Sequence, residues 1–338
     1  MITQRLIDIL TQLIEIDTTN PPGNEAGMVR HLQILLEGSE MRVVEHGHGR
    51  SSLVALVGPI KKERPTLTFI GHMDTVPYTE ENWDYPPLKA TVHLDRLYGR
   101  GASDMKSGLA CMILLAEWCL KNQDKMTANL KLVFTADEEA DGIGMQDIIK
   151  QGLVASDEFL IVPEPTDLRV AYEEKGALWL RLKSFGKASH GSLPEEGSNA
   201  IDAVFHFKQR LFELIACDHR LLGSTTASLN LLQGGSKVNV VADYATAEID
   251  VRYPPDVSDE RLREAVSQSI EYVAQSGVKM EYEVLNFRPA LCSPKKRLAG
   301  AIKEAYEHLQ LSYEEFGVRY YTDLSSFASL ENEYARSV

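Results

Sequence analysis

Acidic side chains and a histidine lie where apolar segments end, and residues of these types can bind metal ions. The segment 66–77 opens with alternating β-branched and apolar residues, which predicts a strand, and it closes with Pro77, which cannot continue a central strand. His72 and Asp74 lie just before that proline. Side chains two positions apart on an extended backbone point to the same face. The pair could therefore be a metal ligand with a carboxylate beside it, or an ordinary turn.

Carboxylates follow two other apolar segments in the same way. The run 130–136 is followed by three consecutive acids, and the run 159–162 is followed by Glu164 between two prolines. The three acids are Asp137, Glu138 and Glu139. Adjacent like charges repel each other unless a cation or a proton is shared. A cluster of this kind at the end of an apolar strand favours a functional site over plain surface polarity.

A glycine-rich loop contributes a further acid. Residues 97–108 read Leu-Tyr-Gly-Arg-Gly-Ala-Ser-Asp-Met-Lys-Ser-Gly, and Asp104 comes directly before an apolar helix predicted over 105–120. Ser103 or Asp104 could simply cap that helix. An acid that follows a glycine-rich loop also favours a functional turn.

The combined set of one imidazole and several carboxylates suits zinc, cobalt or manganese, and thiolate ligands are absent from it. This many acids could hold two metal ions with one carboxylate bridging them. Sites of that kind polarise a scissile carbonyl and generate a nucleophilic hydroxide from water. One acid must then stay free of metal to accept the proton of the water.

The elements that carry these residues predict an α/β domain with a mixed, mostly parallel sheet and flanking helices. From 175 to 286 the pattern changes to strand, helix, two strands, helix, strand, which predicts an inserted α+β (ferredoxin-like) domain. Residues 287–338 are expected to return to the first domain. The catalytic, metal-binding domain would then comprise 1–174 and 287–338.

Composition excludes several classes of protein. A chain of 338 residues is long enough for about two domains. Its net charge of −14 argues against nucleic-acid binding. No apolar run reaches about 18 residues, so no membrane span is expected, and the charged N-terminus lacks the apolar stretch of a signal peptide. The four cysteines form no C-x-x-C pair, and the expected location is the reducing cytoplasm.

Other motifs carry little signal. His46 and His48 lie in a predicted turn, where a histidine is expected to be solvated. Gly99-Arg-Gly-Ala-Ser lacks the third glycine of a dinucleotide fingerprint and the Lys-Ser/Thr of a phosphate-binding loop.

Four motifs, taken in order, resemble those of a known family. They are Gly71-His-Met-Asp-Thr-Val-Pro, Gly99-Arg-Gly-Ala-Ser-Asp-Met-Lys-Ser-Gly, Asp137-Glu-Glu and Glu164-Pro-Thr. The family is that of the zinc-dependent amidohydrolases and peptidases, which includes acetylornithine deacetylase, succinyl-diaminopimelate desuccinylase, carboxypeptidase G and the aminoacylases. The resemblance runs from about residue 5 to about residue 328.

The resemblance implies a site for two zinc ions, with cobalt or manganese as alternatives. The implied ligands are His72, Asp104, Glu139 and Glu164. Asp104 would bridge the two ions. His72 and Glu164 would bind the first ion, and Glu139 would bind the second.

The resemblance also implies the catalytic side chains. Asp74 would orient or tune His72, and Glu138 would be the general base that activates the water. The segment 188–201 is similar to the lid segment of the family. Its His190 would reach the active site of a partner subunit and stabilise the oxyanion there, which implies a homodimer formed through the inserted lid domain.

Two further residues are implied to bind the substrate. Asn239 resembles a substrate-contacting asparagine, and Arg252 resembles the arginine that grips a substrate carboxylate, a task that suits a planar guanidinium. The implied reaction is hydrolysis of the amide bond of an N-acyl amino acid, as in the acetylornithine deacetylase and succinyl-diaminopimelate desuccinylase branch. The alternatives are a di- or tripeptidase or carboxypeptidase of the same family, or a non-catalytic scaffold with an incomplete metal site.

One departure from the family pattern bears on the scaffold alternative. The family places a further metal-binding histidine near the C-terminus, shortly before an Asn-Glu-Tyr sequence. Here no histidine follows His308, and Leu330 runs directly into Glu331-Asn-Glu-Tyr. Either a stretch that carries the histidine is missing between Leu330 and Glu331, or the second metal site truly lacks a ligand and little activity is expected.

Overall fold

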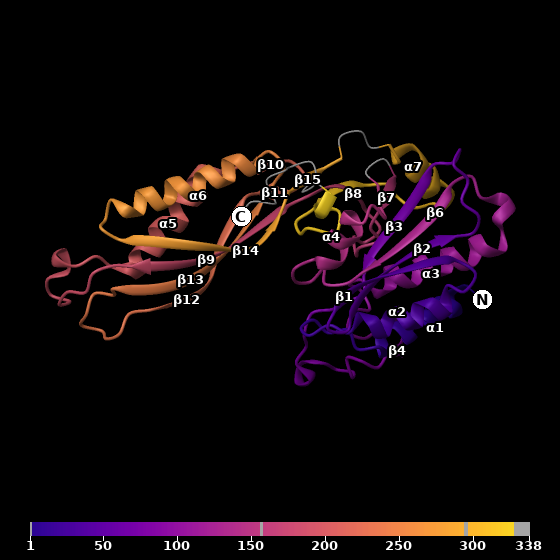
Figure 1. Ribbon diagram of the computed structural model, residues 1–338, viewed down its shortest axis with the longest axis horizontal. Coiled ribbons are helices and arrows are strands. Elements are labelled where there is room, and N and C mark those ends of the chain that lie inside the picture. The colour runs from indigo at the N-terminus through magenta and orange to yellow at the C-terminus, as the bar shows by residue number, and fades with distance from the viewer. Residues whose placement is uncertain (1, 156–157, 294–296, 328–338) are drawn as a thin grey trace. The chain divides into compact units, whose positions relative to one another are not determined.

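A five-stranded sheet organises the N-terminal part of the computed structural model, which describes residues 2–155, 158–293 and 297–327 (Figure 1). In spatial order its strands are β1 (Glu40–Gly47), β2 (Arg50–Val57), β6 (Asn129–Thr135), β3 (Thr66–His72) and β7 (Phe159–Ile161). Strands β6, β3 and β7 are parallel, whereas β1 pairs with β2 and β2 with β6 in antiparallel fashion. The sheet is mixed as expected, and two of its four strand pairings are parallel, because the β1–β2 hairpin joins it through antiparallel pairings.

Four helices cover the two faces of this sheet. They are α1 (Ile2–Glu15), α2 (Glu25–Leu35), α3 (Lys106–Lys121) and α4 (Ile143–Lys150). Side chains alternate between faces along a strand, so Leu53 and Ala55 of β2 pack in one core with α1, α2 and α3, while Val54 packs in another with α4. Shorter elements lie in the connections: β4 (Thr91–His93), β5 (Arg96–Tyr98) and the 3₁₀ turns Glu80–Asn82 and Gln123–Lys125.

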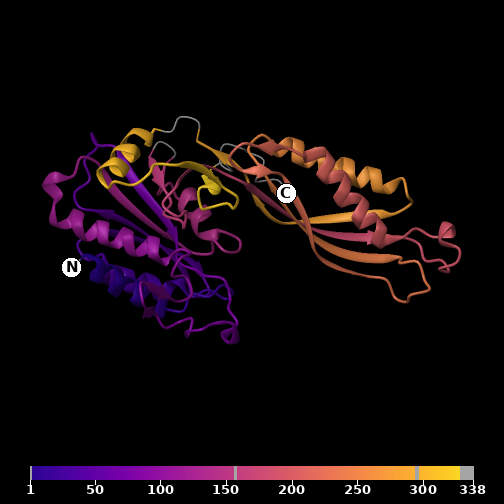
Figure 2. The same ribbon diagram turned by 180° about the vertical axis from the view of Figure 1, so that it is seen from behind.

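An antiparallel sheet of four strands forms the main part of a second unit (Figure 2). In spatial order the strands are β12 (Thr226–Gly234), β13 (Tyr244–Tyr253), β9 (Gly176–Phe185) and β14 (Lys279–Arg288). Helices α5 (Ala200–Ile215) and α6 (Asp259–Ala274) pack against the sheet around a separate apolar core. The chain order is strand, helix, strand, strand, helix, strand, which is that of the ferredoxin-like sandwich expected from the sequence.

The remaining elements complete the two units. They are β8 (Val170–Glu174), β10 (Asp218–His219), β11 (Gly223–Ser224), β15 (Leu291–Cys292), β16 (Glu315–Val318), α7 (Ala299–His308) and the 3₁₀ turn Pro194–Glu196. The first unit contains residues 2–168, 297–301 and 322–327, and the second contains 169–293 and 302–321. Strand β8 thus lies in the second unit, although the sequence placed it at the end of the first domain. The division into a catalytic domain and a lid domain at residues 174 and 287 stays a prediction.

Among the helices in the described ranges, none is both long enough and apolar enough to cross a membrane.

Candidate metal centre

Three neighbouring parallel strands bring the predicted ligands to one edge of the sheet. His72 is the last residue of β3 and pairs in register with Thr135, the last residue of β6. Glu164 follows β7, which lies on the other side of β3. Because parallel strands end at the same edge of a sheet, ligands collect outside their carboxyl ends. The first unit therefore holds His72, the acids after β6 and Glu164 on one rim.

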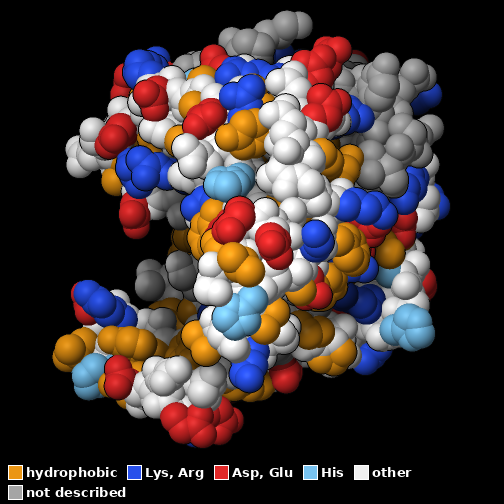
Figure 3. All heavy atoms as spheres, turned by 90° about the vertical axis from the view of Figure 1, so that its left-hand side faces the viewer, with side chains coloured by type: hydrophobic (Ala, Val, Ile, Leu, Met, Phe, Trp, Pro, Cys, Tyr) orange, Lys and Arg blue, Asp and Glu red, His pale blue; other side chains and the backbone are white. Residues whose placement is uncertain are grey.

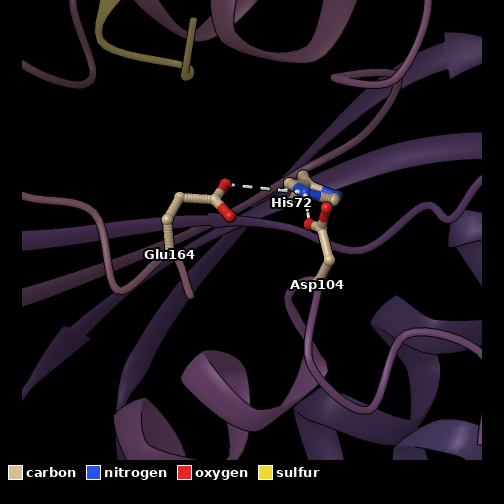
Figure 4. Close-up of side chains that lie close together, drawn as sticks. All are labelled: His72, Asp104 and Glu164. Carbon is tan, nitrogen blue, oxygen red and sulfur yellow. Dashed lines mark hydrogen bonds and ion pairs between the residues drawn. The ribbon is translucent and has the colours of Figure 1, made fainter. Parts of the chain in front are cut away.

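His72, Asp104 and Glu164 form the centre of this site (Figure 4). His72 Nε2 lies 3.0 Å from Asp104 Oδ1 and 3.6 Å from Glu164 Oε1. One ligand atom from each of the three residues lies within 4.8 Å of the others. The other ring nitrogen, His72 Nδ1, donates to the backbone carbonyl of Asp74 at 2.9 Å. That bond leaves Nε2 as the nitrogen that can bind a metal.

The charges around this centre fit a divalent cation. Burial and the nearby Asp104 carboxylate raise the pKa of Glu164 to about 8. Burial and the same carboxylate raise the pKa of Glu139 to about 7. Burial raises the pKa of Glu138 well above its usual value. Burial opposes the charged form of His72, but the hydrogen bond to Asp104 and the surrounding carboxylates raise the His72 pKa well above 6.5. A bound cation would offset the repulsion among these acids.

The metal-free protein is therefore expected to lose stability as the pH rises from about 5 to about 8. Glu164 and Glu139 have folded-state pKa values of about 8 and about 7, above the unfolded value of 4.5. The folded state then binds more protons, so the stability present below pH 4.5 is lost as the pH rises through 7 and 8. The raised pKa of His72 acts in the same direction. The loss should be on the order of 3–5 kcal/mol and should come mainly from the buried Glu164, since one pKa unit corresponds to about 1.4 kcal/mol. The half-buried Glu139 adds less, because solvent screens its charge.

Thermal unfolding of chelator-treated protein at a series of pH values in this window measures the effect. Zinc-loaded protein is the control, and it should show a much smaller pH dependence because the carboxylates are then ligands. Equal stability of the metal-free protein at both ends of the window would contradict the expectation.

Asp74 has partners both at His72 and in the turn after β6. Its Oδ1 lies 3.7 Å from His72 Nδ1, and the bond that holds the imidazole comes from the Asp74 backbone carbonyl instead. The carboxylate accepts hydrogen bonds from the backbone N–H groups of Glu138, at 3.1 Å, and Glu139, at 3.2 Å. Asp74 thus contacts both His72 and the turn that carries the other two acids.

Glu138 and Glu139 follow β6 and differ in their burial. The Glu138 side chain is almost fully buried at the end of β6 and does not belong to the cluster of His72, Asp104 and Glu164. Glu139, the next residue, is half-buried. The sequence-predicted assignment of Glu138 as base and Glu139 as ligand remains a prediction.

Asp323 is a buried acid that the sequence analysis did not assign to the site. It accepts a hydrogen bond from Thr135 Oγ1 at 2.5 Å, and its charge contributes to the raised pKa values of Glu138 and Glu164. It comes from the segment 322–327, which belongs to the first unit. The sequence indicated this residue only through the resemblance to the family, which extends to about residue 328. The expected departure between Leu330 and Glu331 lies outside the described residues.

His46 is buried rather than solvated, contrary to the expectation from its place in a turn. Its Nδ1 lies 2.9 Å from Asp147 Oδ2, and its Nε2 lies 2.9 Å from Ser52 Oγ. This is the residue set of a Ser-His-Asp triad, but Ser52 is fully buried and accepts the N–H of Ala136 at 3.1 Å. The trio therefore supports the end of β6 and offers no accessible nucleophile.

His190, Asn239 and Arg252 lie in the second unit. His190 forms an isolated β-bridge with Val240, and Gly191 N donates to Asn239 O at 2.9 Å. His190 and Asn239 therefore lie on neighbouring segments. His190 and Asn239 are exposed. The backbone N–H of Ser192 donates to His190 Nδ1 at 3.2 Å, which places the proton of a neutral imidazole on Nε2.

Arg252 is held in a defined orientation within the same unit. Its Nε donates to Asp250 Oδ1 at 2.8 Å. Its guanidinium carbon lies 5.4 Å from the ring centroid of Tyr321 and 5.8 Å from that of Trp179. Aromatic faces favour a guanidinium in this position. The roles of Arg252, His190 and Asn239 toward the metal centre stay predictions.

An imidazole and several carboxylates at the ends of adjacent parallel strands define a metal-binding α/β protein. The chain belongs to Peptidase family M20/M25/M40, whose sequence profile matches residues 68–334. It is therefore a metal-dependent hydrolase of this family, as the resemblance of its motifs implied.

The chain is similar in sequence to a probable desuccinylase and similar in fold to solved peptidase structures. It is 29% identical over 330 residues to a probable succinyl-diaminopimelate desuccinylase of Staphylococcus aureus (strain Mu50 / ATCC 700699), covering 88% of this chain and 80% of the relative. The crystal structure of a tripeptidase from Staphylococcus aureus subsp. aureus Mu50 superposes with a TM-score of 0.77 at 23% identity, covering 97% of this chain and 87% of that one. A dinuclear metal-binding peptidase of Bacillus subtilis gives a TM-score of 0.68 at 16% identity, covering 97% and 86%. These structures are similar in fold.

Proposed function

We propose that the chain hydrolyses the amide bond of an N-acyl amino acid that carries a free carboxylate. The observation that carries this proposal is a buried acid, Glu138, beside a cluster of His72, Asp104 and Glu164 at the end of the sheet. The similarity to a probable desuccinylase supports an acyl amino acid as the substrate. The cytoplasm is the proposed location.

Two metal ions per subunit would be held by the acids and the histidine of the first unit. His72 and Glu164 would bind the first ion and Glu139 the second, with Asp104 shared by both. When bound, zinc, or cobalt or manganese in its place, polarises a carbonyl and makes a water molecule more acidic.

The protein's own side chains then handle protons and charge. Glu138 accepts the proton of the attacking water and can return it to the leaving amine. Its burial raises its pKa, which favours a base that can also carry the proton. Asp74 keeps the backbone of Glu138 and Glu139 in place through two accepted hydrogen bonds.

Residues of the second unit would recognise the substrate. The Nε2–H of His190 donates a hydrogen bond to the oxyanion that develops on the scissile carbonyl, in the active site of a partner subunit. Arg252 binds the substrate carboxylate through its planar guanidinium, and Asn239 contacts the substrate.

The proposed partner is a second copy of the chain, paired through the second unit as a lid and dimerisation domain. The edge strand β12 exposes Leu231 and Leu232, whose exposed fractions are 58% and 37%. Figure 3 shows exposed apolar side chains lying among charged ones on one face of the molecule. An edge strand with exposed apolar residues is suited to pairing with another chain.

A panel of zinc-loaded assays tests the substrate class. It contains N-acetyl and N-succinyl amino acids, dipeptides, and the carboxamide counterpart of each acyl amino acid. We expect an N-acyl amino acid to be hydrolysed about 10²-fold or more faster than its carboxamide, because a neutral carboxamide cannot form the charge-assisted hydrogen bonds that a carboxylate makes with the Arg252 guanidinium. The variant Arg252→Gln should remove this preference, whereas Arg181→Gln, on the neighbouring strand β9, should keep it.

The other outcomes distinguish the alternatives. Hydrolysis of dipeptides alone would show a peptidase of the same family and refute the deacylase proposal. A protein that binds metal but hydrolyses nothing in the panel would favour the non-catalytic scaffold.

A further inference from the structure

We infer that Asn20 and Arg50 are positioning residues that hold the turn of Glu138 and Glu139 in place through the buried carboxylates of Asp74 and Asp137. Neither Asn20 nor Arg50 belongs to the metal cluster, and both come from segments far from the turn in sequence. The inference rests on the proposed function of Glu138 as base and Glu139 as ligand.

Asn20 connects the two aspartates. Its Nδ2 donates to Asp74 Oδ2 at 2.9 Å and to Asp137 Oδ1 at 3.0 Å. The backbone fixes this position, because Asn20 N donates to Thr75 O at 2.8 Å and Thr75 N donates to Thr18 O at 3.1 Å. The segment before α2 is thereby paired with the continuation of β3. The Asn20 amide is 6% exposed and lies among buried acids that need a donor.

Asp74 transmits this position to the catalytic turn. With one carboxylate it accepts the N–H groups of two consecutive residues, Glu138 at Oδ1 and Glu139 at Oδ2. A shift of the Asp74 carboxylate would therefore shift the backbone of the base and of a predicted metal ligand together. Displacements of about 1 Å at a reacting group can lower a rate by about 10²-fold.

Arg50 holds the residue that begins the turn. Its NH1 donates to Asp137 Oδ1 at 2.6 Å, and its NH2 and Nε donate to the two oxygens of Glu25 at 2.6 and 3.1 Å. Glu25 has a fully buried side chain, and the Asp137 side chain is 3% exposed. The rigid fork of a guanidinium can serve two carboxylates at once, which an ammonium cannot do with the same geometry.

Asp137 has a conformation that needs such support. Its φ of 70° lies in the left-handed region, which is uncommon for residues other than glycine. Its carbonyl accepts the N–H of Gly142 at 2.6 Å, and its Oδ2 accepts the N–H of Ile143 at 3.3 Å. Asp137 is thus bonded to Arg50 and Asn20 on one side and to the start of α4 on the other.

Gly23 leaves the space that Arg50 occupies. A Cβ built at Gly23 would lie 2.8 Å from three atoms of the guanidinium, and the φ of Gly23 is 76°. The guanidinium therefore packs against bare backbone between Asn20 and Glu25. A buried arginine that is shared by two acids need not add to the stability of the protein. The bond from Arg50 to the first residue of the turn indicates a role in positioning instead.

The variants Arg50→Lys and Asn20→Ala test the inference, with Arg42→Lys as the matched control. Arg42 lies on the same hairpin, is exposed and donates to Gln151 Oε1 at 2.8 Å. Hydrogen exchange of the metal-free protein reports the N–H bonds of residues 137–143 without any substrate. We expect exchange in this segment to become about 10-fold faster in Arg50→Lys and Asn20→Ala, because each substitution weakens hydrogen bonds that hold the turn. Exchange should stay unchanged in Arg42→Lys.

Kinetic constants give the second measurement. We expect kcat to fall by about 10- to 100-fold, as is typical when a residue that orients a ligand is lost, with KM within about twofold of the original value. Unchanged exchange rates in residues 137–143 would overturn the inference. An equal increase of the exchange rates in β6 and in this segment would also overturn it, because it would show a general loss of stability. Should Arg50→Lys fail to fold, Asn20→Ala carries the same expectation. Failure of every substrate would refute the proposed function, while the exchange measurement would still decide the positioning role.

Discussion

Substitution of Glu138 by glutamine is expected to lower kcat by about 10²- to 10⁴-fold, the usual contribution of a general base. Glutamine keeps the shape of the side chain but cannot accept the proton of the water. Glu138 is 8% exposed, so bulk water is poorly placed to replace it. The metal content should stay the same, because the proposed ligands are His72, Asp104, Glu139 and Glu164, and Glu138 is proposed as the base.

Steady-state kinetics and elemental analysis of the purified variant measure both parts of this expectation. Asp141→Asn is a suitable control, because Asp141 is an exposed acid two residues beyond Glu139. It should retain turnover within about twofold, as surface substitutions away from a site usually do. Full turnover by Glu138→Gln would refute the assignment of the base, and loss of metal from it would show that Glu138 is a ligand.

Removal of metal is expected to have an equally large effect, abolishing hydrolysis. Burial raises the pKa of Glu139 to about 7 and that of Glu164 to about 8, so near neutral pH both groups are partly protonated when no cation is bound. Without a cation, the polarisation of the scissile carbonyl is lost, which is worth several kcal/mol in metal-dependent hydrolysis.

Dialysis against a chelator followed by an activity assay measures this effect. Zinc, cobalt or manganese should restore activity, whereas magnesium should not, because it prefers oxygen ligands in octahedral geometry to an imidazole. Two ions per subunit are expected if the site is complete. A single ion with little activity would show that the second site lacks the histidine that the family places near the C-terminus. Full activity in the absence of metal would contradict the proposed function.

Local patterns in the sequence were sufficient to predict the rim of the metal centre. Alternation of apolar residues placed strands before His72, before Glu138 and Glu139, and before Glu164, and the structure contains β3, β6 and β7 there. Covalent geometry sets the two-residue period of a strand, so this information is local. Neighbouring parallel strands then end together, which is why residues about 60 to 90 positions apart meet.

The pairing of strands was predicted less well, because it depends on contacts between distant segments. The turn between β1 and β2 was expected from the sequence, but the antiparallel pairing of β2 with β6 joins segments that are distant along the chain. The ferredoxin-like order of the second unit was easier to predict, since its alternation of strands and helices is visible along the chain.

By itself the sequence determined the residue types of the metal centre, their order and their position at strand ends, because these depend on local periodicity. The tertiary structure alone decided which partners hold them. Asn20 meets Asp74 across 54 residues, Arg50 meets Asp137 across 87, and Thr135 meets Asp323 across 188. No periodicity encodes such pairs, because a side chain finds its partner only when the packed core has brought two distant backbones together.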